Sequence, residues 1–271
     1  MRRLQFRYHM QLTFDFPIHD HHFTLRCTPV DDARQRVLSE KVEIYPKHYS
    51  SEQPDSYGNK CIYGVEKKEH DHFSVDVTGE VEVHEECLIP TPAAHCMGMY
   101  RYRTPLTTAG RTIERFYRDI IGCMPDDKTV KDGDSQVQRV VYMMDKLYQY
   151  LKYEPGTTGV NTTAEEAFEK GAGVCQDYAH ILLTLCRIEQ IPCRYVAGML
   201  LGEGETHAWI EVSDGLHWIP LDPTHNRRVD DTYIKISCGR DAQDCTLNQG
   251  VFIGGGTQRQ EIRVVVQEVI E

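Results

Sequence analysis

Three residues in the second half of the chain have the types and the order that thiol catalysis requires. Cys175 follows the glycine-rich stretch 171–174, and His207 and Asp222 come after it in that order. A cysteine thiolate is a strong nucleophile, an imidazole can exchange the protons, and a carboxylate can fix the imidazole tautomer. The sequence therefore predicts a Cys175–His207–Asp222 catalytic site that needs no metal and no cofactor.

The residues around Cys175 explain why this thiol is singled out. Glycines at 171 and 173 allow a tight turn, and the apolar spacing beyond them indicates that a helix begins near Cys175. Unpaired N–H groups and the helix dipole favour negative charge at a helix start, so they favour the thiolate. The same N–H groups could form part of an oxyanion hole. The second oxyanion donor is left unassigned.

Two strands must bring the histidine to the aspartate. Residues 206–212 and 216–221 alternate as strands, and Ser213-Asp214-Gly215 between them is a strong hairpin signal. His207 then lies on the first strand and Asp222 closes the second, so neighbouring antiparallel strands can place them side by side. Helical periodicity predicts further elements over 111–121, 136–153, 163–171 and 175–189, with another strand over 193–201.

The first half of the chain has a different periodicity. Apolar residues alternate along 4–14, 37–44, 61–65 and 73–83, as in half-buried strands. Pro90-Thr91-Pro92 interrupts this pattern. We expect a β-rich N-terminal domain over 1–92, a catalytic core over 93–250, and a C-terminal strand within 251–271. This last strand could pair with either half.

Composition limits the function classes. The 271 residues are 40% hydrophobic and carry a formal charge of −11, which argues against a nucleic-acid partner. The apolar runs are too short to span a bilayer, and no apolar segment typical of a signal peptide follows the N-terminus. The ten cysteines are scattered and form no CxxC pair. We expect reduced, mostly buried thiols in a cytoplasmic protein that has no membrane partner.

Other histidines offer alternative roles. His217 lies on the neighbouring strand and is a rival base, while His225 is a substitute for Asp222 as the group that orients the base. The histidines within 19–22, together with His70 and His72, could form a metal site if the fold gathered them. A polar strand end is the simpler interpretation of that cluster.

Several segments together resemble a known family. They read GVCQDYA, IPCRYVAG, THAW and LDPTH at 173–179, 191–198, 206–209 and 221–225. This combination resembles the transglutaminase-like superfamily, in particular its bacterial members described as cysteine proteases. The N-terminal segments 22–26 and 55–59 are similar to the β-rich region that precedes the core in those proteins.

The resemblance implies both a fold and a reaction. The implied fold is α+β: a papain-like core, in which helices pack on an antiparallel sheet, preceded by an all-β domain. The implied site is a triad of Cys175, His207 and Asp222, acting on a peptide, protein or other amide through a thioester. Amide hydrolysis is the reaction we expect. Transfer of the acyl group to an amine, as in a transglutaminase, and a non-catalytic binding module are the alternatives. The EF-hand calcium loop is absent.

Overall fold

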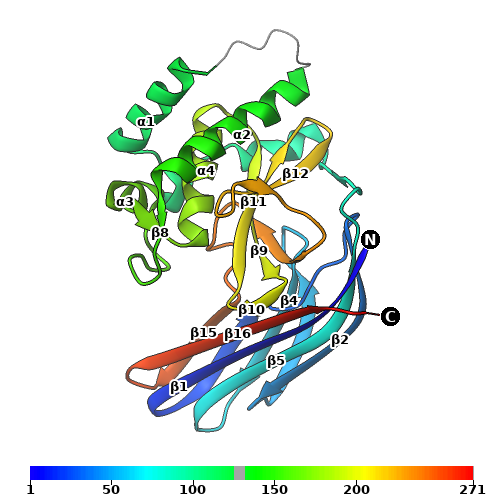
Figure 1. The fold of residues 1–271 in the computed structure, drawn as a ribbon. Helices are drawn as coiled ribbons and strands as arrows, with labels where there is room; N and C mark the ends of the chain where they lie inside the picture. The colour runs from blue at the N-terminus through cyan, green and yellow to red at the C-terminus, as the bar shows by residue number, and fades with distance from the viewer. Residues whose placement is uncertain (125–131, 271) are drawn as a thin grey trace.

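The computed structural model describes residues 1–124 and 132–270, and it combines a large curved sheet with a helix-covered second sheet (Figure 1). The helices are α1 (Arg111–Gly122), α2 (Asp132–Tyr150), α3 (Ala164–Lys170) and α4 (Cys175–Ile188), with 3-10 turns at Ala94–Tyr100 and Pro105–Thr107. The strands of the larger sheet are β1 (Arg2–Leu25), β2 (Gln35–Tyr45), β3 (Tyr49–Pro54), β4 (Lys60–Glu66), β5 (His70–Val83), β10 (Gly202–Gly204), β15 (Asn248–Gly254) and β16 (Gln258–Glu268). Those of the second sheet are β6 (Ile89–Pro90), β9 (Cys193–Leu200), β11 (His207–Ser213), β12 (His217–Asp222), β13 (Arg227–Arg228) and β14 (Tyr233–Gly239).

The larger sheet is built around β1, whose alternating apolar residues face the core as predicted. Leu4, Phe6 and Tyr8 are all buried while the residues between them face outward. β1 pairs antiparallel with β5 along one edge and with β16 along the other. The C-terminal strand therefore joins the N-terminal half, with Phe6 opposite Val266.

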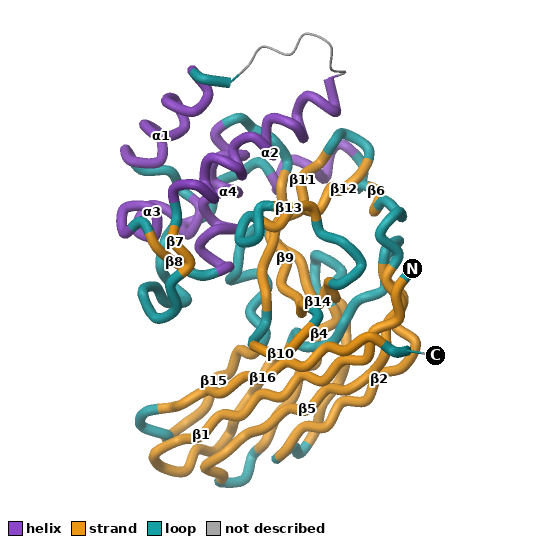
Figure 2. Tube along the Cα trace, viewed as in Figure 1, coloured by secondary structure: helices purple, strands orange, loops and turns teal. Residues whose placement is uncertain are grey.

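The second sheet carries the helices on one face, in agreement with the predicted α+β class (Figure 2). Its central strands run in the order β12-β11-β9-β14, all antiparallel. The helix α4 packs against it, and Ile181, Leu182 and Leu185 are fully buried in the core that the sheet and helices share. All residues of α4 from 177 to 187 are buried, because the sheet covers one side of this helix and the other helices pack on the rest.

One local prediction was wrong. The helix predicted over 136–153 ends at Tyr150, because the next residues form β7 (Lys152–Tyr153) and pair in parallel with β8 (Ala172–Gly173). The proline segment at 90–92 follows the N-terminal strands, and Ile89–Pro90 forms the short β6 against β12 at the edge of the second sheet. A proline is compatible with such an edge position, where its missing N–H breaks no ladder.

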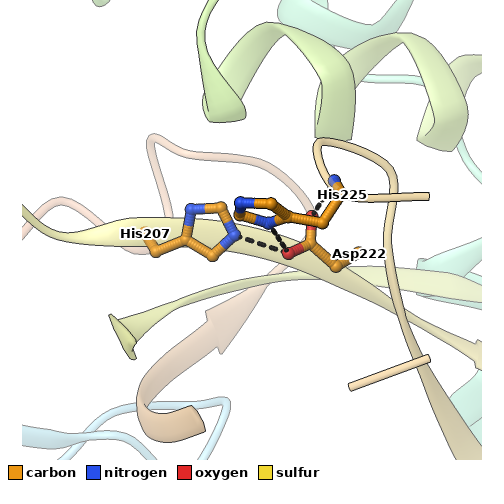
Figure 3. Close-up of side chains that lie close together, drawn as sticks. All are labelled: His207, Asp222 and His225. Atoms are coloured by element: carbon orange, nitrogen blue, oxygen red, sulfur yellow. Dashed lines mark hydrogen bonds and ion pairs between the residues drawn. The ribbon is translucent and has the colours of Figure 1, made fainter. Parts of the chain in front are cut away.

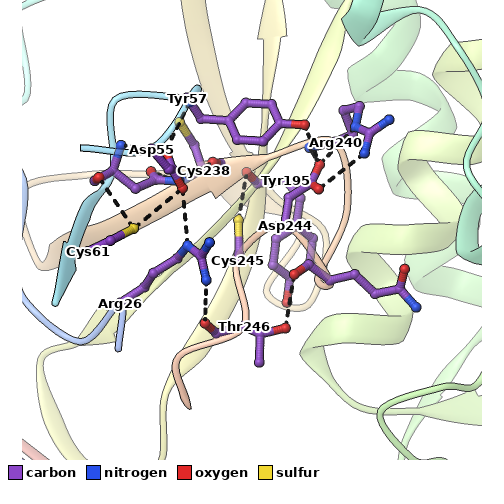
Figure 4. Close-up of polar contacts among 12 residues, drawn as sticks. Arg26, Asp55, Tyr57, Cys61, Tyr195, Cys238, Arg240, Asp244, Cys245 and Thr246 are labelled. Carbon is purple, nitrogen blue, oxygen red and sulfur yellow. Dashed lines mark hydrogen bonds and ion pairs between the residues drawn. The ribbon is translucent and has the colours of Figure 1, made fainter. Parts of the chain in front are cut away.

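Apolar and polar contacts join the two sheets. Met199 and Ile234 of the second sheet are buried in the same cluster as the apolar face of β1. The Tyr57 hydroxyl donates to Asp244 Oδ2 at 2.7 Å (Figure 4). Asn59 Nδ2 donates to the Cys238 carbonyl at 2.8 Å. The division at residues 92 and 250 into separate domains stays a prediction. Within the described ranges, no helix has both the length and the apolar character needed to cross a membrane.

Candidate active site

Cys175 is the first residue of α4 and is partly buried. Asp177 fixes this helix start, because its Oδ2 accepts hydrogen bonds from the Val174 N–H at 2.8 Å and the Thr158 hydroxyl at 2.6 Å. A side chain at position 173 would place its Cβ 2.6 Å from Asp177 Oδ2, so glycine is required there. The helix start predicted from the sequence is confirmed.

His207 and Asp222 lie close together on β11 and β12. The register pairs Ile210 with Leu221, which brings the start of β11 near the end of β12. His207 Nε2 lies 2.8 Å from Asp222 Oδ2, with the side chains 10% and 0% exposed. A short bond of this kind inside the protein is a charge-assisted hydrogen bond, and it fixes the orientation of the imidazole.

Asp222 is the point at which several donors converge. Its Oδ2 also accepts from His225 Nδ1 at 2.7 Å and from the Tyr233 hydroxyl at 2.7 Å, and its Oδ1 accepts from the Thr224 N–H at 2.8 Å. Burial opposes ionisation of Asp222, but the hydrogen bonds from His207 and His225 outweigh it and hold its pKa well below the usual range. Asp222 is therefore an ionised carboxylate despite its burial.

His207 also interacts with Cys175. Burial lowers the pKa of His207, but hydrogen bonds with Asp222 and with Cys175 outweigh it and raise this pKa to about 9. Because Nε2 is occupied by Asp222, Nδ1 is the ring nitrogen left for the thiol. Of the three residues predicted from the sequence, His207 and Asp222 are joined by a hydrogen bond, and Cys175 contributes to the raised pKa of His207. A thiolate beside an imidazolium is the form in which such a cysteine attacks a carbonyl carbon.

The rival histidines are placed elsewhere or in other roles. His217 faces Asp214, with its Nδ1 3.5 Å from that carboxylate, on the far end of β12. His225 does not replace Asp222 but shares its oxygen with His207. The other nine cysteines are free; six of them are buried and Cys87, Cys96 and Cys123 are partly or fully exposed.

The N-terminal histidine cluster is not gathered into a metal site. His19 and His72 each pair with the acidic residue beside them in the chain, whereas His21 Nδ1 lies 3.3 Å from His70 Nε2. In the parts of the chain that the structure describes, three or more potential ligands converge only at His207, Asp222 and His225.

Sequence reasoning missed Tyr233. It lies on β14, which is not a neighbour of β12 in the sheet, yet its hydroxyl reaches Asp222. A tyrosine within an apolar strand has no local signal that distinguishes it from a core residue. Only the fold reveals that its hydroxyl is directed at the buried carboxylate.

Comparison with known families gives two matches that lie one after the other along the chain. Residues 4–82 match the bacterial transglutaminase-like N-terminal region, and residues 126–223 match the transglutaminase-like superfamily core. The second match contains Cys175, His207 and Asp222.

Relatives that match most of the chain are also found. An uncharacterized protein of Mycobacterium leprae is 29% identical over 259 residues, which is 89% of each chain. One from Mycobacterium tuberculosis is 25% identical over 253 residues, covering 83% of this chain and 79% of the relative. A crystal structure from Cytophaga hutchinsonii, described as a "putative cysteine protease", superposes with a TM-score of 0.79 at 20% identity, covering 100% of this chain and 91% of that one. The two proteins share a fold over the whole of this chain.

Proposed function

Because the chain belongs to the transglutaminase-like superfamily, we propose that it is a thiol-dependent amide hydrolase with Cys175 as nucleophile, His207 as acid and base, and Asp222 as the residue that orients His207. The observation that carries the proposal is the hydrogen bond between His207 Nε2 and the fully buried Asp222, in a histidine whose pKa is also raised by Cys175. A cytoplasmic location and a peptide, protein or other amide substrate are part of the same proposal.

The reaction follows from these positions. The Cys175 thiolate attacks the carbonyl carbon of the amide, and the C–N bond breaks as His207 gives its proton to the departing amine. The acyl group is then held as a thioester on Cys175. His207, now neutral, takes a proton from water as the water attacks the thioester, which releases the carboxylic acid and restores the thiolate–imidazolium pair. Asp222 keeps the imidazole in place throughout.

Selective alkylation tests the nucleophile. We expect limiting iodoacetamide at about pH 6, where an ordinary thiol of pKa ~8.5 is protonated, to label Cys175 before the exposed Cys96. His207→Ala should slow labelling of Cys175 at least tenfold and leave labelling of Cys96 unchanged. Equal labelling rates for Cys175 in both proteins, located by peptide mass mapping, would remove the thiolate–imidazolium pair from the proposal.

A second experiment tests whether water or an amine accepts the acyl group from the thioester. A panel of glutamine-containing peptides and simple amides is incubated with the protein, with and without a labelled primary amine. Hydrolysis gives free ammonia or amine and no labelled product, whereas transfer gives label in the acyl fragment. Cys175→Ala should abolish either reaction. Selective labelling of Cys175 without turnover of any amide would favour a binding module over an enzyme.

A further inference from the structure

Two imidazoles converge on one carboxylate oxygen at the end of β12. His207 Nε2 and His225 Nδ1 lie 2.8 and 2.7 Å from Asp222 Oδ2, and the potential ligand atoms of the three residues all lie within 4.8 Å of one another (Figure 3). The hydrolysis proposed above uses only one of these imidazoles. The imidazole of His225 therefore has no role in the proposed hydrolysis and is available to bind a ligand.

This donor set is suited to a transition metal. Two imidazoles and a carboxylate are typical ligands of Zn²⁺, which binds them at about 2.0–2.2 Å and takes four ligands in a tetrahedron. Ionised carboxylate and neutral imidazole nitrogens are the forms that bind. The backbone N–H of Thr224 holds the other oxygen of Asp222 at 2.8 Å, so the carboxylate is oriented before any ion arrives.

The cluster has an open side and room to adjust. The side chain of His225 is 44% exposed and lies in the turn that follows β12, while Asp222 is fully buried. Tetrahedral zinc holds its ligand atoms about 3.3 Å apart. The two nitrogen–oxygen separations must each widen by roughly half an ångström, and rotation of the exposed His225 side chain provides part of this movement.

We propose that His207, Asp222 and His225 form a binding site for Zn²⁺ or a similar divalent transition metal, and that the bound ion inhibits the thiol chemistry. The ion would lie between the two imidazoles and Asp222 Oδ2, with water as its fourth ligand. This site departs from the sequence expectation of no metal.

Inhibition follows from which ring nitrogen the ion takes. Coordination replaces the proton on His207 Nε2, so the imidazole no longer forms the imidazolium that stabilises the thiolate and protonates the leaving amine. This consequence rests on the proposed function, whereas the binding of the metal does not. Since Nε2 faces Asp222 and Nδ1 is left for the thiol, the ion lies on the side of the ring away from Cys175. Metal binding should therefore not need the thiol.

The binding test uses chains that cannot hydrolyse a substrate. Cys96 and Cys123 are exposed and are replaced by serine in every protein compared, so that they do not contribute zinc ligands. Zinc is titrated calorimetrically into this background with Cys175→Ala, and again with His225→Gln or His217→Gln added. We expect one zinc per chain with Cys175→Ala, at least tenfold weaker binding with His225→Gln, and no change with the control His217→Gln. Loss of one of three protein ligands accounts for the expected difference.

A second measurement needs no substitution at the site. Diethyl pyrocarbonate should modify the exposed His225 in the background with wild-type Cys175, His207, Asp222 and His225, and zinc should protect it at least tenfold, with the exposed His72 as internal control. The metal site is overturned if zinc does not bind, if His225→Gln leaves the affinity unchanged, if Cys175→Ala abolishes binding, or if zinc gives no protection.

Failure of the two proposals can be distinguished. Zinc binding that depends on His225, in a protein that never turns over an amide, leaves the metal site standing without the hydrolase. Conversely, amide hydrolysis that zinc does not inhibit, in a protein shown to bind zinc through His225, overturns the inhibitory role alone. Where hydrolysis occurs, zinc should inhibit it with the affinity measured by calorimetry, and His225→Gln should raise the inhibitory concentration at least tenfold.

Discussion

Asp222 is the residue whose surroundings matter most for the proposed chemistry. Its buried charge is compensated by imidazole, phenol and backbone donors, and among the side-chain donors only His207 lies on a strand that pairs with β12. A buried carboxylate without such partners would take up a proton and lose its ability to stabilise an imidazolium. The phenol of Tyr233 is therefore expected to position Asp222 as well as to fill space.

Replacing Tyr233 with phenylalanine tests this role. A hydrogen bond to a charged group is worth about 1.5–3 kcal/mol, so we expect kcat to fall about tenfold or more while KM changes little. Tyr117→Phe is the control, because the Tyr117 hydroxyl also donates to a carboxylate, Glu189 Oε1 at 2.9 Å, but far from the site. If both substitutions reduce kcat equally, Tyr233 has only a structural role.

At the scale of elements, the start of α4 decides where the nucleophile lies. Asp177 is almost fully buried, and it links the first turn of α4 to Thr158 in the loop that precedes α3. Burial raises the pKa of Asp177, although the hydrogen bonds from Thr158 and Val174 act in the opposite direction. The helix start is thus held by a tertiary contact as well as by its own backbone.

Asp177→Ala should loosen the first turn of α4, where Cys175 lies. The unsatisfied Val174 N–H and the lost side chain should lower the free energy of unfolding in urea by about 1–3 kcal/mol, and alkylation of Cys175 should slow. Asp177→Asn, which keeps an acceptor, should restore part of both. Glu166→Ala removes the equivalent cap of α3, where Glu166 Oε2 accepts from the Thr163 N–H at 2.9 Å. It should cost stability without slowing alkylation, and equal slowing in both variants would contradict the role of Asp177.

At the scale of the whole molecule, a buried ionic network ties the second sheet to the N-terminal half. Glu211 on β11 pairs with Arg194 Nε at 2.6 Å and Lys235 Nζ at 2.9 Å, and Lys235 also lies 3.4 Å from Asp32. Burial raises the pKa of Glu211, but the two cations outweigh it and lower this pKa to about 2. Removing one member leaves buried charge without compensation.

Glu211→Gln should lower the free energy of unfolding by about 3–5 kcal/mol at neutral pH. The sign of the pH dependence follows from the depressed pKa: the contribution of Glu211 is complete above its ordinary pKa of 4.5 and is lost as the pH falls towards about 2. The stability gap between the two proteins, measured by denaturant titration, should therefore narrow over that interval. Glu203→Gln is the control, since Glu203 forms an exposed pair with Arg263 and its loss should cost under about 0.5 kcal/mol. A gap that stays constant from pH 5 to 2 would contradict the assigned cause.

The sequence by itself determined the local features of this protein. The alternation along β1, the glycines before Cys175 and the Asp-Gly turn between β11 and β12 are short-range signals, because strand pleat, helix start and hairpin geometry depend on neighbouring residues. The same signals, with the motifs around them, identified Cys175, His207 and Asp222 as the candidate residues. The pairing of strands and side chains that lie far apart in the chain could not be predicted from these local signals.

Only the tertiary structure decided which distant groups meet. The C-terminal strand had the same alternation whichever sheet it joined, and pairing with β1 was selected by the apolar face that it covers there. His225 reaches Asp222 because of the turn that follows β12. Tyr233 reaches Asp222 from β14, a strand that does not pair with β12. Contacts between residues far apart in the chain leave no periodic pattern in the sequence, because they are set by how whole elements bury their apolar faces.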